Sequence, residues 1–171
     1  MFFALTELEH HPILFDLNYP AGEVEFGEEL RQRGELHVAG KAELLQHTLG
    51  EIRVRGRVDV DFDCNCDRCL EPATENLHAD FDLFYRPVPK VYAHVETQLE
   101  EGEVDVSFYE GDGVELEAVL HEFVIVSQPM QHLCKPECKG LCPHCGVNRN
   151  TKECGFEGIV VDKKLAKLKQ L

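Results

Sequence analysis

The chain has 171 residues, of which 43% are apolar and 29% are charged, and this composition predicts a globular protein with one sizeable core. No stretch approaches the roughly 20 apolar residues of a transmembrane helix, so a membrane contact is not expected. The net charge of −15 disfavours passive adhesion to nucleic acid, because affinity for phosphate comes mainly from Lys and Arg. The first residues lack the basic and apolar regions of a secretory signal, which predicts a cytoplasmic, reducing compartment.

The charges are distributed unevenly along the chain. Residues 61–130 contain 3 basic and 17 acidic side chains, whereas residues 131–171 contain 8 basic and 4 acidic ones. An acidic surface keeps a small domain soluble or attracts a basic protein. Direct contact with RNA is therefore expected only at the basic end and at the hairpin described below. The candidate RNA-binding residues are Lys135, Lys139, Arg149, Lys152 and Arg68.

The first half of the chain reads mainly as β-strands. The first 30 residues are irregular, with one short strand expected around Phe15 and Leu17, and from Gly34 a strand with a bend at Gly40 follows. The clearest strand covers residues 52–62, where apolar and charged residues alternate with a period of two. The alternation resumes over residues 77–85, and the short segment between the two runs predicts an antiparallel hairpin.

The outer face of this hairpin carries a basic stripe. Three arginines alternate with apolar residues in the first strand, and acidic residues occupy the same face of the second. Cross-strand ion pairs are therefore expected, and they make the stripe structural rather than RNA-binding. The residues concerned are Arg53, Arg55 and Arg57 with Asp80 and Asp82.

The second half of the chain adds one helix to the predicted sheet. Residues 90–103 are expected to form a polar loop, followed by a short strand over 104–108 and a turn at 110–113. Apolar residues at helical spacing predict a packed helix over 114–128 that ends before Pro129, and a short basic helix is expected from Asp162. The fold class is therefore α+β: a mostly antiparallel sheet, or a partly closed barrel, with one packed helix. The expected division is a body of residues 1–130 and a cysteine-rich, metal-binding appendage of residues 131–171 with a basic tail.

Eight cysteines in a chain expected to be reduced indicate metal ligation rather than disulfides. Cys142-Pro-His-Cys145-Gly146 is typical of a zinc knuckle, in which two thiolates grip one ion and the glycine turns the chain with positive φ. The candidate ligands are Cys134, Cys138, Cys142, Cys145 and Cys154. Residues 131–158 are too polar to form a core, so zinc is expected as a structural cofactor that orders them. A closed cysteine site leaves no position for a substrate.

A second pair of cysteines, Cys66 and Cys69, lies at the tip of the predicted hairpin. The pair could form a second metal site, share the first one, act as a redox pair, or remain as partly buried free thiols. The redox alternative is disfavoured because a thioredoxin-type pair starts a helix within a βαβ unit. Cys64, two residues earlier, is expected to be a spare thiol.

Catalytic signatures are not apparent in the sequence. It contains no nucleophile elbow, phosphate-binding glycine loop or paired-carboxylate signature, so neither an enzyme nor a small-molecule substrate is expected. No aromatic residues are interleaved with the basic ones, and a stacking platform for single-stranded RNA is therefore not expected either.

The segments Cys66-Asp-Arg-Cys69-Leu70 and Cys138-Lys-Gly-Leu-Cys-Pro-His-Cys-Gly, with a β-rich body and a helix that ends at a proline, resemble the YceD family of large ribosomal RNA accumulation proteins. The resemblance runs from about residue 15 to residue 156. It implies a bacterial or organellar ribosome-biogenesis factor for the accumulation or processing of large-subunit ribosomal RNA, with no established catalytic residues. The implied partners are the RNA precursor or ribosomal proteins.

Three functions remain open on these grounds. The first is a non-enzymatic factor that binds pre-ribosomal RNA or particles through the basic end. The second is an adaptor whose acidic body binds a basic ribosomal protein before its incorporation. The third is a thiol-redox or metal-handling protein, which would form a reversible Cys66–Cys69 disulfide or hold a labile zinc ion.

Overall fold

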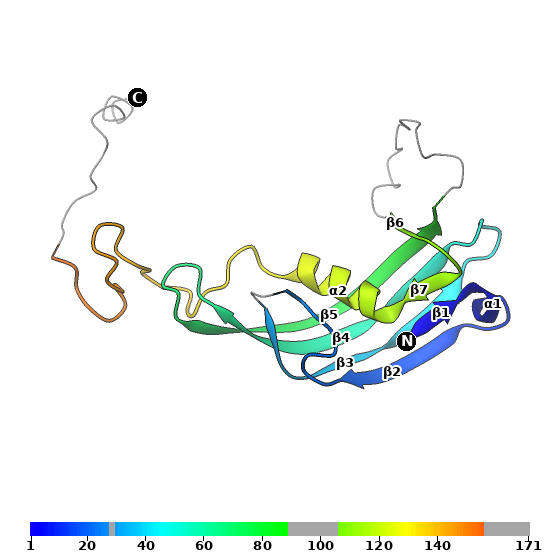
Figure 1. The fold of residues 1–171 in the computed structure, drawn as a ribbon, viewed down its shortest axis with the longest axis horizontal. Coiled ribbons are helices and arrows are strands. Elements are labelled where there is room, and N and C mark those ends of the chain that lie inside the picture. The colour runs from blue at the N-terminus through cyan, green and yellow to red at the C-terminus, as the bar shows by residue number, and fades with distance from the viewer. Residues whose placement is uncertain (28–29, 89–105, 156–171) are drawn as a thin grey trace, which may run out of the picture.

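The computed structural model describes residues 1–27, 30–88 and 106–155, and it has a long, curved sheet with one helix on its inner side (Figure 1). The strands are β1 (Phe2–Ala4), β2 (Ile13–Tyr19), β3 (Arg31–Leu44), β4 (Ile52–Asn65), β5 (Pro72–Pro87), β6 (Val106–Tyr109) and β7 (Gly113–Glu115). The helices are α1 (Leu5–Leu8) and α2 (Leu116–Ser127). Within the described residues, neither helix has the length and apolar character needed to cross a membrane.

The main sheet has five strands in the order β2-β3-β4-β5-β6 and is open. Strands β2 to β5 are antiparallel neighbours, whereas β6 runs parallel to the end of β5. The α+β class with a mostly antiparallel sheet is thus confirmed, and of the two predicted forms, a sheet or a partly closed barrel, the structure has the open sheet and no closed barrel. The physical reason is that β6 pairs with only four residues of β5, so the sheet stops there, and α2 packs over its inner side instead (Figure 1).

Strands β4 and β5 form the predicted hairpin, which extends beyond the other strands toward the cysteine-rich segment (Figure 1). The outer-face arginines are neutralised largely as expected. Arg53 Nε donates to Asp82 over 2.7 Å, and Arg57 Nη1 lies 4.0 Å from Asp80. Arg55 pairs with the neighbouring strand on the other side of β4, where its Nη2 lies 3.7 Å from Glu43 of β3.

Helix α2 buries the predicted apolar face. Leu116, Val119, Leu120 and Val124 are buried, and the Phe123 ring packs 5.4 Å from the ring of Phe81 on β5. The helix begins at Leu116 rather than at residue 114, because Gly113–Glu115 form β7 and pair with β1. It ends at Ser127, and Gln128 is already extended, since a residue that precedes proline is sterically driven out of the helical region.

The N-terminal third is more regular than its sequence suggests. Strand β2 covers the seven residues Ile13–Tyr19, and β3 begins at Arg31, where its polar first residues pair with residues 61–63 of β4. The segments β1 and α1 were not predicted. The expected loop of residues 90–103, the first two positions of the expected strand at 104–108, and the basic helix from Asp162 lie outside the described residues.

Two glycines stand opposite each other in the middle of the sheet. Gly40 of β3 and Gly56 of β4 are register partners, and the same row continues to Phe15 of β2 and Phe81 of β5. A Cβ atom at Gly56 would press on the backbone oxygen of Ala39 and lie 3.0 Å from the Phe81 ring. The missing side chains therefore let the two aromatic rings cover the strands at this point.

We expect the substitution Gly56→Ala to lower the free energy of unfolding by about 3 kcal/mol, because the added carbon meets backbone, which cannot move aside. The measurement is the midpoint of urea unfolding. Gly155→Ala is the matched control, since a Cβ there meets nothing within 4 Å, and its midpoint should not change. Equal midpoints for the two variants would contradict this account of the sheet.

Candidate metal centre

The hairpin tip docks against the chain that follows α2. The backbone N–H of Asp67 donates to the carbonyl of His132 over 2.9 Å, and the His132 N–H donates to the Asp67 carboxylate over 2.7 Å. Further along, the N–H of Leu141 donates to the carbonyl of Arg68 over 2.9 Å. These contacts bring residues 66–71 and residues 131–155 together, and we refer to the two segments as the tip.

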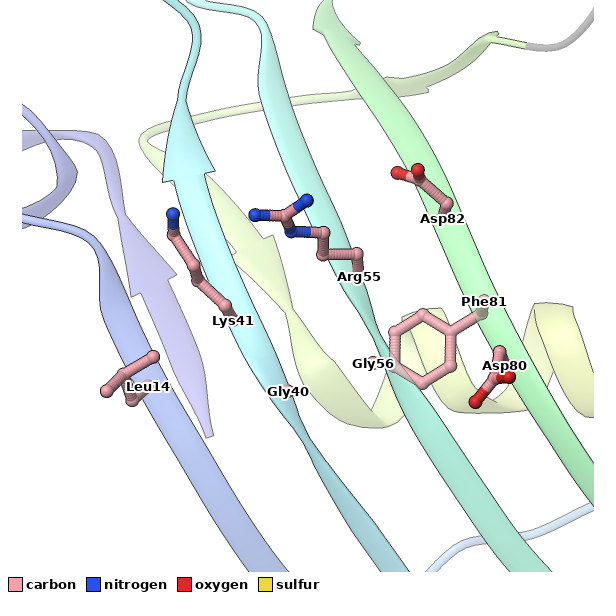
Figure 2. A pocket seen from close by; sticks show the side chains of 8 residues that line it. All are labelled: Leu14, Gly40, Lys41, Arg55, Gly56, Asp80, Phe81 and Asp82. Atoms are coloured by element: carbon pink, nitrogen blue, oxygen red, sulfur yellow. The ribbon is translucent and has the colours of Figure 1, made fainter.

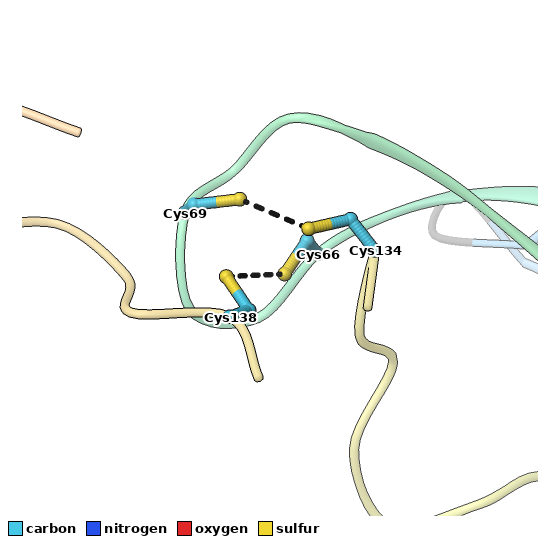
Figure 3. A group of neighbouring side chains, drawn as sticks. All are labelled: Cys66, Cys69, Cys134 and Cys138. Carbon is cyan, nitrogen blue, oxygen red and sulfur yellow. Dashed lines mark hydrogen bonds between the residues drawn. The ribbon is translucent and has the colours of Figure 1, made fainter. Parts of the chain in front are cut away.

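Four cysteines of the tip form one cluster, site A: Cys66, Cys69, Cys134 and Cys138 (Figure 3). Their Sγ atoms all lie within 4.8 Å of one another, with 3.7 Å between Cys66 and Cys138 and 3.6 Å between Cys69 and Cys134. Zinc bound tetrahedrally at about 2.3 Å from each sulfur requires sulfur–sulfur edges of about 3.8 Å. The thiols of site A therefore fit a tetrahedral zinc ion with little movement.

The other three cysteines of the tip form site B: Cys142, Cys145 and Cys154. The Sγ of Cys154 lies 3.2 Å from that of Cys142 and 3.5 Å from that of Cys145. Cys142 is buried, whereas Cys145 is exposed. Site B is thus a three-thiol cluster near the surface, and its sulfurs would have to spread by a few tenths of an ångström around a zinc ion.

The first two cysteines of each site lie in loops of the same backbone geometry, knuckle 1 (residues 66–71) and knuckle 2 (residues 142–147). The residue after the second cysteine has a positive φ, +61° at Leu70 and +70° at Gly146. Its N–H donates to the carbonyl of the first cysteine over 2.8 Å in knuckle 1 and 2.9 Å in knuckle 2. A non-glycine residue in this conformation costs about 1–2 kcal/mol, so Leu70 is held there by the loop around it.

Backbone N–H groups point at the first sulfur of each knuckle. Burial opposes ionisation of Cys66, but backbone N–H donors, those of Cys134 and Cys69 foremost, outweigh it and lower the pKa of this thiol to about 6. In knuckle 2 the N–H groups of His144 and Cys145 lower the pKa of Cys142 to about 7. A thiolate is the form that binds metal, so both knuckles favour metal ligation at their first cysteine.

Asn150 connects the two sites. Its side-chain N–H donates to Cys138 Sγ over 3.2 Å and lowers the pKa of that thiol, while its Oδ1 accepts from the N–H of Lys139 over 2.9 Å. The same side-chain nitrogen lies 2.9 Å from Asn148 Oδ1. Because residues 148–150 follow knuckle 2 directly, Asn150 positions a ligand of site A from the segment that carries site B.

We expect Asn150→Ala to weaken metal binding at site A by about 10- to 100-fold, because the variant lacks a hydrogen-bond donor to a ligating sulfur. Competition of the purified protein with a chromophoric chelator measures the affinity. Asn18→Ala, at an exposed position of strand β2, is the control and should leave the affinity unchanged. If both variants bind metal as the unaltered chain does, Asn150 has no role in the site.

The five candidate ligands of the cysteine-rich segment do not lie in one cluster, and two of them lie with Cys66 and Cys69, the pair for which a second or shared site was left open. Cys134 and Cys138 lie with Cys66 and Cys69, and only Cys142, Cys145 and Cys154 lie together at knuckle 2. Cys64 is buried outside both sites, and burial raises the pKa of its thiol. The sequence did not indicate roles for Asp67, which docks the two segments, or for Asn150, because neither residue is expected to ligate zinc in a cysteine-rich site. The turn at Leu70 could have been predicted, since Leu70 follows Cys69 as Gly146 follows Cys145.

The predicted RNA-binding residues surround these sites. Lys135, Lys139, Arg149 and Lys152 are exposed. Two of them have a fixed backbone, because the N–H of Lys139 is held by Asn150 and that of Arg149 donates to the Gly140 carbonyl over 2.9 Å. Arg68 also has a structural contact, since its guanidinium donates to the Cys138 carbonyl over 3.2 Å.

A groove of 590 Å³ lies away from the tip, on the outer face of the sheet (Figure 2). Its charged side chains take part in pairs within the sheet: Lys41 Nζ lies 2.6 Å from Glu43, and Asp82 is bound by Arg53. The groove is therefore lined by groups that hold neighbouring strands together. Its lining residues are Leu14, Gly40, Lys41, Arg55, Gly56, Asp80, Phe81 and Asp82.

An open, mostly antiparallel sheet with clustered thiols at one end defines a candidate metal-binding protein, and one of its two thiol clusters joins segments far apart in the sequence. Residues 54–171 match the model of the family described as large ribosomal RNA subunit accumulation protein YceD, and the chain belongs to this YceD family. No catalytic activity is part of that description. No solved structure matches the chain.

Curated relatives are distant. Uncharacterized proteins of Mycobacterium bovis and Mycobacterium tuberculosis are 26% identical over 122 residues, which is 70% of this chain and 55% of each relative. A maize (Zea mays) protein named large ribosomal RNA subunit accumulation protein YCED homolog 1, chloroplastic, is 25% identical over 132 residues, which is 60% of this chain and 42% of that protein. The chain thus spans about half the length of the curated relatives it matches.

Proposed function

We propose that this chain supports the accumulation of large-subunit ribosomal RNA without catalysing a reaction, by binding pre-ribosomal RNA or a precursor particle through the tip. The observation that carries the proposal is site A, where four thiols from the β4–β5 hairpin and from the chain after α2 converge. A metal ion there fixes exposed basic side chains in one arrangement. In this proposal residues 1–130 are the body and residues 131–171 the metal-binding appendage.

The metal we propose is zinc, bound at both sites. Four soft thiolates at tetrahedral spacing suit zinc, and this arrangement of four supports metal binding over a two-thiol redox pair. At site A the ion supplies shape rather than chemistry, because four cysteines leave no open position. A reducing compartment such as the cytoplasm keeps the thiols available.

The RNA contact we propose is to phosphate. Lys135, Lys139, Arg149 and Lys152 supply charge on exposed side chains, and Arg68 adds to it beside knuckle 1. Two acidic residues of the tip take part in contacts within the tip. The Asp67 carboxylate accepts a hydrogen bond from the His132 N–H, and Glu71 lies 3.4 Å from the Asn148 side-chain nitrogen. The family description, which names large ribosomal RNA, supports this partner class.

The test is the ratio of large- to small-subunit ribosomal RNA in cells that lack the protein. We expect the ratio to fall, and to be restored by the unaltered chain and by Cys64→Ser but not by Cys66→Ser. Cys64 and Cys66 are both buried at the same end of the hairpin, but only Cys66 belongs to site A. A normal ratio of large- to small-subunit ribosomal RNA in cells that lack the protein would contradict the proposal.

The charge distribution favours a second candidate, an adaptor that binds a basic ribosomal protein. Residues 61–130 carry 17 acidic and 3 basic side chains, which suits a positively charged protein partner. Capture of the tagged chain from cell extract after nuclease treatment separates the two functions. Ribosomal proteins that remain bound after RNA is digested support the adaptor, and their complete loss supports contact through RNA.

A further inference from the structure

Sites A and B have knuckles of the same geometry but differ in the number of further cysteines that join them. In site A the two sulfurs of knuckle 1 are joined by two more, from Cys134 and Cys138. In site B the two sulfurs of knuckle 2 are joined by one described cysteine, Cys154. Three donors that are mutually close occupy one face of a tetrahedron, which leaves its fourth vertex without a sulfur.

The described surroundings of site B are open to solvent at knuckle 2. Pro143, His144 and Cys145 are exposed, although Cys142 is buried and Cys154 is half-buried. In site A three of the four cysteines are buried and Cys134 is exposed. Site B thus combines one sulfur fewer with an exposed knuckle, and a donor from outside the cluster can approach it at Cys145.

We propose that site B binds a zinc-class metal ion with an open fourth position, which accepts an exogenous thiolate or imidazole donor. This inference rests on the metal binding proposed above and extends it, because it makes the two ions unequal: the ion at site A is fixed and the ion at site B is exchangeable. A closed cysteine site was expected for the whole segment from its sequence, and site A alone meets that description.

The chemical reason for the difference is the order of events in ligand exchange. At an open position an incoming donor can bind before any metal–sulfur bond breaks. At a four-thiolate site a sulfur must first leave, and in site A three of the four cysteines are buried and two of them are held in the hairpin, which resists this movement. Thiolate and imidazole are the donor classes that match the preference of zinc.

The experiment uses the full chain, stripped of metal and reloaded with Co²⁺, whose absorption reports the donor set. We expect two bound ions, and a shift of part of the visible absorption on addition of imidazole. In the same protein a chelator should remove one ion in a fast phase and the other in a slow phase. Cys145→Ser should lose the imidazole response and the fast phase while it keeps the slow ion.

The outcomes separate this inference from the proposed function. Two ions that leave in one slow phase, with no response to imidazole, overturn the exchangeable site and leave site A untouched. An imidazole response that persists in Cys145→Ser also overturns it. If residues after 155 supply a carboxylate as the fourth donor, Glu157→Gln or Asp162→Asn will alter the spectrum before imidazole is added, and the position is not open. A chain that binds no metal overturns the zinc assignment itself.

Discussion

Replacement of Cys138 by serine is expected to remove the metal ion of site A and to detach residues 131–155 from the hairpin, while the sheet stays folded. Cys138 is 4% exposed, and its sulfur lies 3.7 Å from that of Cys66. A serine hydroxyl is a much poorer zinc ligand than a thiolate, so the tetrahedron lacks one corner in this variant. The ion contributes folding free energy directly, because the site does not exist in the unfolded segment.

The detachment follows from how little else holds the segment. Among the described residues after 130, the apolar cluster of the protein includes Cys138, with Leu133 packed against it. The sheet has its own support, because β4 and β5 pair over 14 positions and α2 buries four side chains against the inner side. Loss of the ion should therefore act on the tip and leave the melting of the sheet nearly unchanged.

Hydrogen exchange measures the detachment at single amides. The N–H groups of Asp67 and Leu141 bond across the junction, to the carbonyls of His132 and Arg68, and should lose protection in Cys138→Ser. The ladder amides of β4 and β5 should keep theirs. Cys64→Ser is the control, since Cys64 is buried outside both sites, and metal content should fall only in the Cys138 variant. Protected junction amides in a metal-free variant would show that the thiols do not hold the tip together.

The parts of the fold with a long, regular period were predictable from the sequence. The hairpin of β4 and β5 follows from alternation over residues 52–62 and again over residues 77–85, and α2 follows from five apolar positions on one face. Strands β1 and β7 have three residues each, too few to display a period, and they exist because they pair with each other. The parallel pairing of β6 with β5 depends on the path of the chain between them, which periodicity does not encode.

In the metal centre, too, the local part was predictable from the sequence and the part formed by tertiary contacts was not. Knuckle 2 was visible because its two ligands and Gly146 are local in the sequence. Sequence reasoning left open whether Cys66 and Cys69 share a site with the later cysteines, because the halves of site A are 72 residues apart at Cys66 and Cys138 and meet through tertiary contacts such as that of Asp67 with His132. Spacing along the chain predicted that Cys138 ligates the same ion as its nearer neighbour Cys142. The tertiary contact of the hairpin tip overrides that proximity and gives each knuckle its own site.

The triple variant Lys135→Ala, Lys139→Ala, Arg149→Ala is expected to bind large-subunit ribosomal RNA fragments far more weakly and with a flatter dependence on salt. Each duplex phosphate that the protein no longer neutralises flattens the slope of log K against log salt by about 0.9, so three such phosphates change it by about 2.7. Titrations at several KCl concentrations give the slope. Lys139 and Arg149, whose backbone is fixed, should contribute fully, because no ordering of the loop is needed at binding.

The basic stripe of the sheet supplies a charge-matched control. The variant Arg53→Ala, Arg55→Ala, Arg57→Ala removes the same three positive charges, but these arginines are engaged with Asp82, Glu43 and Asp80. RNA affinity and salt slope should therefore stay close to those of the unaltered chain. An equal loss in both variants would mean that net charge alone governs binding. Cys138→Ser then tests the arrangement of the tip: it removes no basic side chain, so weaker RNA binding by this variant supports a role for the metal-ordered arrangement.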